Sequence, residues 1–465
     1  MLEIETMGLR AEHEVPAGPI DNGGFRFIDL FAGLGGFHVA LERLGGRCVF
    51  ASEWVPALQS LYEMNFGVPV HGDITKVKIG DIPEHDFLTA GFPCQPFSKA
   101  GEQLGFDHTL QGQLFFEVLR ILEERRPKSF VLENVPNLLK HKSGSTFDFM
   151  RKQLERLGYH VAAARRSPHQ FGIPQVRDRL YIVGAQDSLD GFEWPEPQSD
   201  TTDIRSVLDV RPAEARPVRG SALVALELWQ EFLDRAPSGT RLPSFPLWAM
   251  EWGATYEFED RSPHEQLRSE GAGSFSGLWG SFFRQIRGSS DDEVTTALPT
   301  YAMVRTPTLP TWKRQFIRQN RDFYAEHQSW IAPWLSKLAQ LPTSFQKMEW
   351  NVKGGRLTLQ DHVIQMRASG LRVKRATSAP ALVAMTDSQV PIIGWERRYM
   401  TPVECSRLQG LHGITLPATE KDAYRALGNA VNADVVERIA ASLLGRSDDV
   451  SGGLDGSVTL PIAIG

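Results

Sequence analysis

The stretch Gly91–Ser98 (GFPCQPFS) holds Cys94 in a loop between two prolines, directly after the apolar segment Phe87–Ala90. That segment predicts a strand, and doubly wound sheets bind their ligands at the carboxyl ends of their strands. The other two cysteines, Cys48 and Cys405, fall within an expected strand and an expected helix, where a thiol is typically buried and inert. Cys94 alone therefore has a polar, loop-borne setting that suits a thiolate nucleophile.

Charged residues lie at two further strand ends. Glu133 closes the apolar strand pattern SFVLENV, where a carboxylate is costly unless it has a task, and it would lie beside Cys94 if their strands are neighbours. Arg177 and Arg179 precede the strand pattern LYIVGA and, in an extended stretch, point to the same side. Two fixed guanidinium groups suit carbonyl or phosphate oxygens; the alternative is an ordinary salt bridge with Asp178 or Glu133.

A glycine turn, Phe31–Gly36 (FAGLGG), follows the first expected strand and would let a ligand approach the backbone, although a purely structural turn has the same pattern. It lacks the spacing of the dinucleotide fingerprint and the Gly-Lys-Ser/Thr of a triphosphate site. Glu53 ends the second strand, where a carboxylate can bind a ribose diol. Asp73, after the third, could meet a base edge or simply cap a turn. A phosphate-free adenosine ligand beside a cysteine loop suggests S-adenosyl-L-methionine.

Strands alternate with helices around these residues, which predicts an α/β fold with a Rossmann-like, doubly wound parallel sheet. Helices are expected over 56–65, 113–126 and 432–444, and Thr401-Pro402-Val403-Glu404 has the pattern of a helix start. From Trp194 onward the sequence is rich in Trp, Pro, Arg and Ser with weak periodicity, which predicts a second, irregular domain. The expected organisation is a flexible leader (1–24), a catalytic and cofactor-binding domain (25–187), the irregular domain (188–395), a segment returning to the catalytic domain (396–445) and a flexible tail (446–465).

Composition excludes several classes of protein. With 42% hydrophobic and 23% charged residues among 465, and no apolar run near the roughly 20 residues of a membrane span, we expect a soluble, cytoplasmic protein. Three widely spaced cysteines predict neither a metal site nor a disulfide framework. The net charge of −6 does not by itself indicate a nucleic-acid binder, but the basic runs 305–321 and 367–375 contain no acidic residue.

Six blocks in order resemble the cytosine carbon-5 DNA methyltransferases of bacterial restriction and modification systems. They are DLFAGLGG (29–36), GFPCQPFS (91–98), ENV (133–135), QFGIPQVRDR (170–179), RYMTPVECSRLQG (398–410) and YRALGNAVN (424–432). The resemblance implies the S-adenosylmethionine-dependent methyltransferase fold and covers nearly half the chain.

The resemblance also implies residue roles. Cys94 matches the nucleophile, Glu133 the acid that engages the ring nitrogen, and Arg177 and Arg179 the arginines that hold the cytosine. The positions implied to contact or shape the pocket for S-adenosyl-L-methionine are Phe31, Gly33, Gly35, Glu53, Asp73, Pro93, Leu114 and Asn429. The substrate is then a cytosine flipped out of double-stranded DNA, because a stacked base offers neither face.

The family's target-recognition region corresponds to Ser188–Trp395, which holds both basic runs and so would present a cationic face to DNA. Arg372–Thr377 with Ala381-Leu382 resembles the family's recognition signature, with Ala381 in place of its usual threonine. A cognate restriction endonuclease is an implied partner, no membrane partner is expected, and we expect a monomer.

Three other functions remain open. A cytosine methyltransferase acting on transfer RNA would share the catalytic half, although its recognition region is usually short. A catalytically inactive DNA-binding homologue is disfavoured by the retained Cys94 and Glu133. A Rossmann oxidoreductase is disfavoured because the dinucleotide fingerprint is absent.

Overall fold

The computed structural model describes residues 24–92, 110–198, 201–382 and 389–446. Pro93 and Cys94, and nearly all of the expected leader and tail, lie outside these ranges. Among the described residues, no helix has the length and apolar character needed to cross a membrane. Nor do these residues bring three or more His, Cys, Asp or Glu side chains together as a metal site would require.

The first half of the chain forms a seven-stranded sheet in the order β3-β2-β1-β4-β5-β8-β6. The order reverses between β1 and β4, the switch point at which doubly wound sheets bind ligands. The strands β1 to β5 run parallel, as expected, whereas β8 runs antiparallel to both of its neighbours. Residues 167–178 join β6 to β8 and contain a short 3₁₀ turn and β7 (Gln175–Val176) in place of the crossover helix that usually connects a parallel pair. The bounds are β1 Phe25–Leu30, β2 Gly46–Ser52, β3 Val70–His71, β4 Phe87–Ala90, β5 Ser129–Asn134, β6 His160–Arg166 and β8 Arg179–Ala185.

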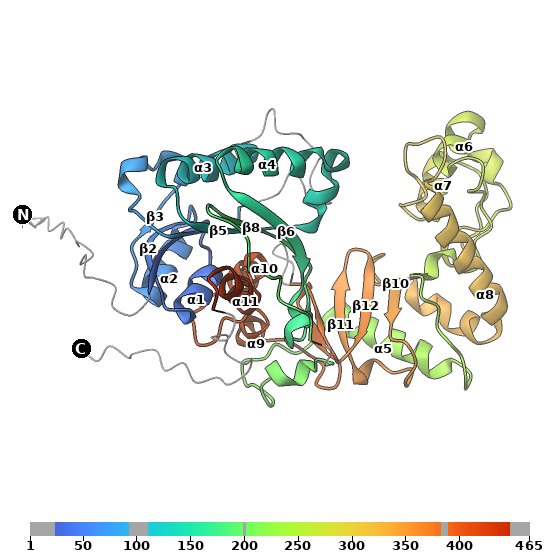
Figure 1. The fold of residues 1–465 in the computed structure, drawn as a ribbon. Helices are drawn as coiled ribbons and strands as arrows, with labels where there is room; N and C mark the ends of the chain where they lie inside the picture. The colour runs from blue at the N-terminus through green and yellow to red at the C-terminus, as the bar shows by residue number, and fades with distance from the viewer. Residues whose placement is uncertain (1–23, 93–109, 199–200, 383–388, 447–465) are drawn as a thin grey trace, which may run out of the picture.

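Helices cover both faces of this sheet (Figure 1). On one face α1 (Gly36–Arg43), α2 (Pro56–Phe66) and α11 (Ala433–Leu443) share a core with Phe27 and Val131. On the other, α3 (Leu110–Arg125) and α4 (Ser145–Arg156) pack on Ile28, Leu88 and Phe130. Because strand side chains alternate, every strand of this sheet except the two-residue β3 contributes to both cores. The Rossmann-like fold is confirmed.

A second sheet lies beside the first domain, in the order β15-β14-β11-β12-β10-β9 (Figure 1). The expected second domain has more regular structure than its sequence pattern predicted: the described part of 188–395 contributes five strands of this sheet and a long helix, α8 (Thr311–Leu338). Periodicity was weak because most of the strands are short and α8 contains Pro333 and a break at His327. The strand bounds are β9 Leu247–Trp248, β10 Lys347–Asn351, β11 His362–Arg367, β12 Gly370–Arg375, β14 Ile392–Ile393 and β15 Arg398–Tyr399.

The second sheet continues beyond the expected boundary at Trp395, since β15 follows it. One face of the sheet packs in a shared core with α5 (Gly220–Arg235) and α8. At the far end of the molecule, α6 (Pro263–Glu270), α7 (Asp291–Ala297) and the start of α8 enclose a separate small core around Tyr256 and Phe275 (Figure 1).

Three short elements connect the parts. A two-stranded sheet pairs β7 (Gln175–Val176), from the first domain, with β13 (Ala379–Pro380), which lies along the chain between β12 and β14 of the second sheet. The chain then returns through α9 (Pro402–Arg407) and α10 (Glu420–Asn429) to α11. The helix start expected at Thr401 is confirmed, because its side chain and that of Glu404 form a capping box.

Candidate active site

The glycine turn after β1 has a conformation that few residues other than glycine adopt. Phe31, Gly33 and Gly35 have φ values of 59°, 55° and 80°, so the backbone is left-handed at three positions. A Cβ at Gly36 would lie 2.3 Å from the carbonyl oxygen of Val431, so Gly36 is required by the returning C-terminal segment. Among the described residues, a Cβ at Gly33 would meet only the Phe31 oxygen, at 3.9 Å, so these residues leave room for a ligand there.

Glu53 lies directly after β2 and closes this turn from the side. Its carboxylate accepts hydrogen bonds from the backbone N–H of Gly33, at 3.0 Å, and of Val55, at 2.9 Å. Burial raises its pKa, and these backbone hydrogen bonds oppose the shift. Two donors fix the position of the carboxylate, while its remaining lone pairs can accept from a ligand hydroxyl.

Beneath the turn lies a buried polar network that the sequence reasoning missed. Asp29, on β1, accepts hydrogen bonds from the hydroxyls of Thr89 (3.2 Å) and Tyr62 (3.3 Å), and Tyr62 also bonds to His38 at 2.6 Å. Burial raises the pKa of Asp29 well above its usual value and lowers that of His38 to about 3. The sequence could have indicated this network, because an aspartate inside the apolar strand pattern FRFIDLF needs buried hydrogen-bond partners.

Trp54, also missed, follows Glu53 and is 78% exposed. An exposed indole beside a fixed carboxylate at the sheet's carboxyl edge can stack on a planar ring. The sequence could have indicated Trp54 through its position directly after Glu53, the acid expected to bind a ribose diol.

The other residues predicted to bind the cofactor have varied surroundings. Asp73 caps a short 3₁₀ turn by accepting from the backbone N–H and hydroxyl of Thr75, at 3.1 and 2.8 Å, and the hydroxyl contact lowers its pKa most. Asp73 therefore caps a turn, which was one of the two roles expected for it. Its contact with a base stays a prediction. Leu114 is half-buried on α3, and Asn429 is exposed at the end of α10.

Glu133 and Arg179 meet at the neighbouring strand ends. The Nε of Arg179 lies 2.8 Å from Oε1 of Glu133, and both side chains are largely buried. Because β4 and β5 are parallel neighbours, Glu133 also lies at the edge from which the loop containing Cys94 departs. Burial raises the pKa of Glu133, while Arg179 and Arg177 partly oppose the shift, so the acid form persists to higher pH than in an ordinary carboxyl.

Arg177 has a different environment from Arg179. Its Nη1 donates to the carbonyl oxygen of Leu382, at 3.3 Å, and its Nη2 donates to those of Gly428 (3.0 Å) and Ala430 (2.9 Å). Burial lowers the pKa of Arg177 to about 9, so the side chain remains charged at neutral pH. These contacts tie three distant segments together beside Glu133; holding a cytosine stays a prediction for this residue.

The two cysteines within the described residues are both buried. Burial raises the pKa of Cys48 to about 12 and that of Cys405 further still. Neither thiol is therefore available as a thiolate near neutral pH. Cys94 lies outside the described residues, and its role as the nucleophile stays a prediction.

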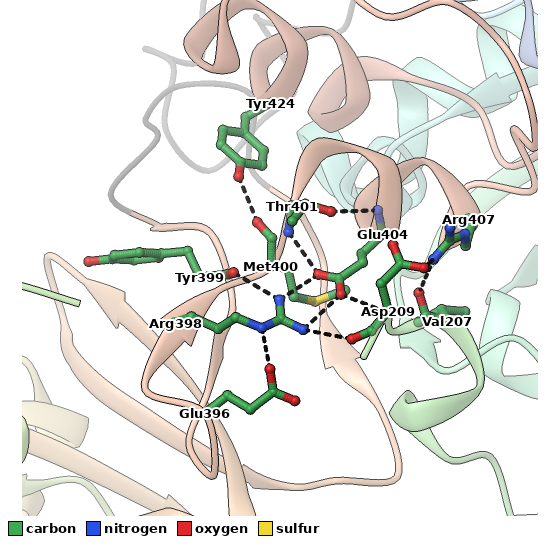
Figure 2. Close-up of polar contacts among 10 residues, drawn as sticks. All are labelled: Val207, Asp209, Glu396, Arg398, Tyr399, Met400, Thr401, Glu404, Arg407 and Tyr424. Atoms are coloured by element: carbon green, nitrogen blue, oxygen red, sulfur yellow. Dashed lines mark hydrogen bonds and ion pairs between the residues drawn. The ribbon is translucent and has the colours of Figure 1, made fainter. Parts of the chain in front are cut away.

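A buried ion pair fixes the junction between the second sheet and the returning segment (Figure 2). Arg398, on β15, donates from Nη1 and Nη2 to the two carboxylate oxygens of Glu404, both at 2.8 Å. Glu404 also accepts from the backbone N–H groups of Thr401 (2.8 Å) and Asp209 (2.9 Å). One carboxylate thus joins β15, the start of α9 and the segment that enters the second domain.

The first basic run is in part neutralised by the fold. Lys313 donates to the Tyr301 carbonyl at 2.8 Å, and Arg314 donates to that of Glu259, also at 2.8 Å. Arg318 and Arg321 form ion pairs with Glu259 and Glu251, at 2.7 and 3.1 Å. Carboxylates far away in the sequence thus neutralise Arg318 and Arg321, two of the five basic residues of this run, and the expectation that the run presents a cationic face stays a prediction.

Comparisons with known proteins agree with this arrangement. Residues 25–224 match the family model described as C-5 cytosine-specific DNA methylase. The type II methyltransferase M.AluI of Cellulosimicrobium cellulans is 31% identical over 493 aligned residues, which cover 90% of this chain and 91% of that protein. The chain belongs to the C-5 cytosine-specific DNA methylase family.

Some relatives are more identical to this chain over a shorter stretch, which spans less than two thirds of their own length. The type II methyltransferase M.HaeII of Haemophilus aegyptius is 46% identical over 185 residues, 40% of this chain and 58% of that protein. A crystal structure of a proposed DNA modification methyltransferase from an E. coli prophage is also similar, with a TM-score of 0.50 and 17% identity. The match covers 91% of this chain and 99% of the chain in that structure. That likeness supports the fold.

Proposed function

We propose that this chain transfers a methyl group from S-adenosyl-L-methionine to carbon 5 of a cytosine within a short double-stranded DNA sequence. The observation that carries the proposal is the match to M.AluI over nine-tenths of both chains, which includes the recognition half as well as the catalytic half. A cognate restriction endonuclease acting on the same sequence is the partner we infer from the type II relatives.

The residues around the glycine turn fit S-adenosyl-L-methionine. The open space over Gly33 admits the ligand, Glu53 is positioned to accept from the ribose hydroxyls, and Trp54 offers a face to the adenine ring. When bound, S-adenosyl-L-methionine supplies an electrophilic methyl group on a sulfonium. The buried hydrogen bonds that Asp29 accepts from Tyr62 and Thr89 hold the glycine turn in position for this ligand.

The protein's chemical task is to make cytosine carbon 5 nucleophilic. In the proposed step the Cys94 thiolate adds to carbon 6 while Glu133, in its acid form, gives a proton to nitrogen 3, which converts the ring to an enamine. Carbon 5 can then accept the methyl group. Loss of the carbon-5 proton and expulsion of the thiolate restore the aromatic ring.

The Glu133–Arg179 pair suits this role. Burial favours the protonated carboxyl, and the adjacent guanidinium stabilises the carboxylate left after proton transfer. The cytosine must leave the duplex to reach this edge, at a cost of a few kcal/mol that contacts in the pocket offset.

The test is expression of the full chain in a host without cytosine methylation, followed by mapping of methylcytosine across the genome. Methylation of one cytosine within a consistent short sequence is expected. Absence of methylcytosine in DNA, with methyl transfer to transfer RNA in a parallel assay, would instead support the RNA methyltransferase alternative.

A further inference from the structure

The second basic run differs from the first in that it leaves donors free. Arg367, at the end of β11, and Arg372, on β12, share one carboxylate, that of Glu349 on β10. The Nε of Arg372 donates to Oε2 of Glu349 at 3.0 Å, and Nη2 of Arg367 donates to Oε1. Among the described residues, the two terminal nitrogens of Arg372 have no hydrogen-bond partner, and its side chain is 34% exposed.

These side chains lie on one face of the second sheet. The opposite face carries Leu371 and Val373, which are buried in the core shared with α5. Since strand residues alternate, Arg372 and Lys374 point away from that core, as does Gln365, which is paired with Arg372 across β11 and β12. This polar face is defined by Glu349, Gln365, Arg367, Arg372 and Lys374.

The polar face is directed toward the first domain. The Gln365 amide donates to the Gln389 carbonyl at 2.9 Å, in the segment that follows β13 and whose Leu382 carbonyl accepts from Arg177. Burial lowers the pKa of His169, in the first domain, and the positive charge of Lys374 contributes to this lowering. The polar face therefore borders the side of the molecule on which Glu133 and Arg179 lie.

We propose that Arg372, oriented by Glu349, contacts a guanine of the methylated DNA sequence through its two terminal nitrogens. This inference rests on the proposed function. A guanidinium held through Nε presents its two Nη groups as a fixed fork, and guanine O6 and N7 are the pair of major-groove acceptors that match such a fork. Glu349 is a positioning residue, and Arg367 holds its second oxygen in place.

The charge balance favours a base over the backbone. Glu349 offsets one of the two adjacent arginine charges, which weakens attraction to phosphate but leaves the directed donors of Arg372 intact. A phosphate contact would add affinity for every sequence alike, whereas a guanine contact discriminates at one base pair.

The test measures initial rates of methyl transfer by the full-length chain on duplexes that carry each possible base pair at each position of the mapped target. Arg372→Gln is expected to lower discrimination at one G·C position by about tenfold or more, with other positions unchanged. Glu349→Gln should lower discrimination at that same position. The matched control is Arg318→Gln, in the first basic run, where Nε and Nη2 both donate to Glu259; it should leave discrimination unchanged.

The guanine contact is overturned if Arg372→Gln slows all duplexes equally and lowers the salt dependence of binding, which is the signature of a phosphate contact. Unchanged discrimination with active enzyme also overturns it. Arg372→Lys keeps the charge but loses the fork, and it should relax the same position even if the glutamine variant fails to fold. No methyl transfer to DNA by the wild-type chain would overturn the proposed function itself, and the guanine contact with it.

Discussion

Replacing Glu404 with glutamine should destabilise the junction between the two domains. The expected loss in the free energy of unfolding is larger than the loss from breaking an exposed ion pair. The carboxylate accepts four hydrogen bonds, from Nη1 and Nη2 of Arg398 and from the backbone N–H groups of Thr401 and Asp209, and Glu404 is fully buried. An amide can accept at only one of its two terminal atoms, and it would leave the buried Arg398 guanidinium with Glu396, 2.6 Å from its Nε, as its remaining carboxylate partner. Breaking a buried pair in this way costs about 3–5 kcal/mol.

The assay is urea unfolding followed by tryptophan fluorescence and circular dichroism, with coincident transitions required before free energies are compared. The control is Glu259→Gln, which removes the exposed partner of Arg318 and should cost about 1 kcal/mol or less. Combining Glu404→Gln with Arg398→Met should cost less than the sum of the two single changes, because each single change already removes the interaction between these two residues. A loss below about 1 kcal/mol for Glu404→Gln, or strict additivity, would refute this reasoning.

Three further predictions concern the candidate active site. Glu133→Gln should lower turnover by about 10²–10⁴-fold. Because burial raises the Glu133 pKa and the acid form is the donor, wild-type turnover should fall as pH rises through that pKa, and a pH–rate profile of the variant should lack this fall. Glu53→Gln should weaken S-adenosyl-L-methionine binding about tenfold in calorimetry while DNA affinity stays unchanged, since the lost contact is a charge-assisted hydrogen bond. Arg177→Met leaves three carbonyls without their donor and should lower the free energy of unfolding by about 3 kcal/mol, measured in urea. If the variant is as stable as the wild-type chain, Arg177 does not hold these segments together.

Local patterns predicted the elements that position the site. Alternating strands and helices, the glycine turn and the capping sequence at Thr401 each depend on residues a few positions apart, and the structure has all three. The adjacency expected for the strands of Glu133 and the cysteine loop also follows from the parallel order of β4 and β5.

Long-range pairing explains what the sequence could not reveal. The basic run 305–321 is free of acids locally, but Glu251 and Glu259, which neutralise Arg321 and Arg318, come from a loop about 60 to 70 residues earlier. Arg177 likewise finds its acceptors more than 200 residues away. No local pattern encodes these partners, so the sequence shows which residues are charged but not which of them are paired in the fold.

The antiparallel β8 was missed for a related reason. The strand pattern LYIVGA is buried on both faces, as in a parallel strand, and its direction depends on the connection from β6. Burial alone cannot distinguish the two directions.

The most direct test of the central claim is covalent trapping on duplex DNA in which the target cytosine carries fluorine at carbon 5. Fluorine cannot leave as the proton does, so the adduct formed after methyl transfer cannot expel its thiolate. With S-adenosyl-L-methionine present, the wild-type chain should give a complex that survives denaturation, with the bond to DNA mapped by mass spectrometry to Cys94, and Cys94→Ala should give none. Equal trapping by Cys94→Ala, or methylation by that variant at the wild-type rate, would contradict the account.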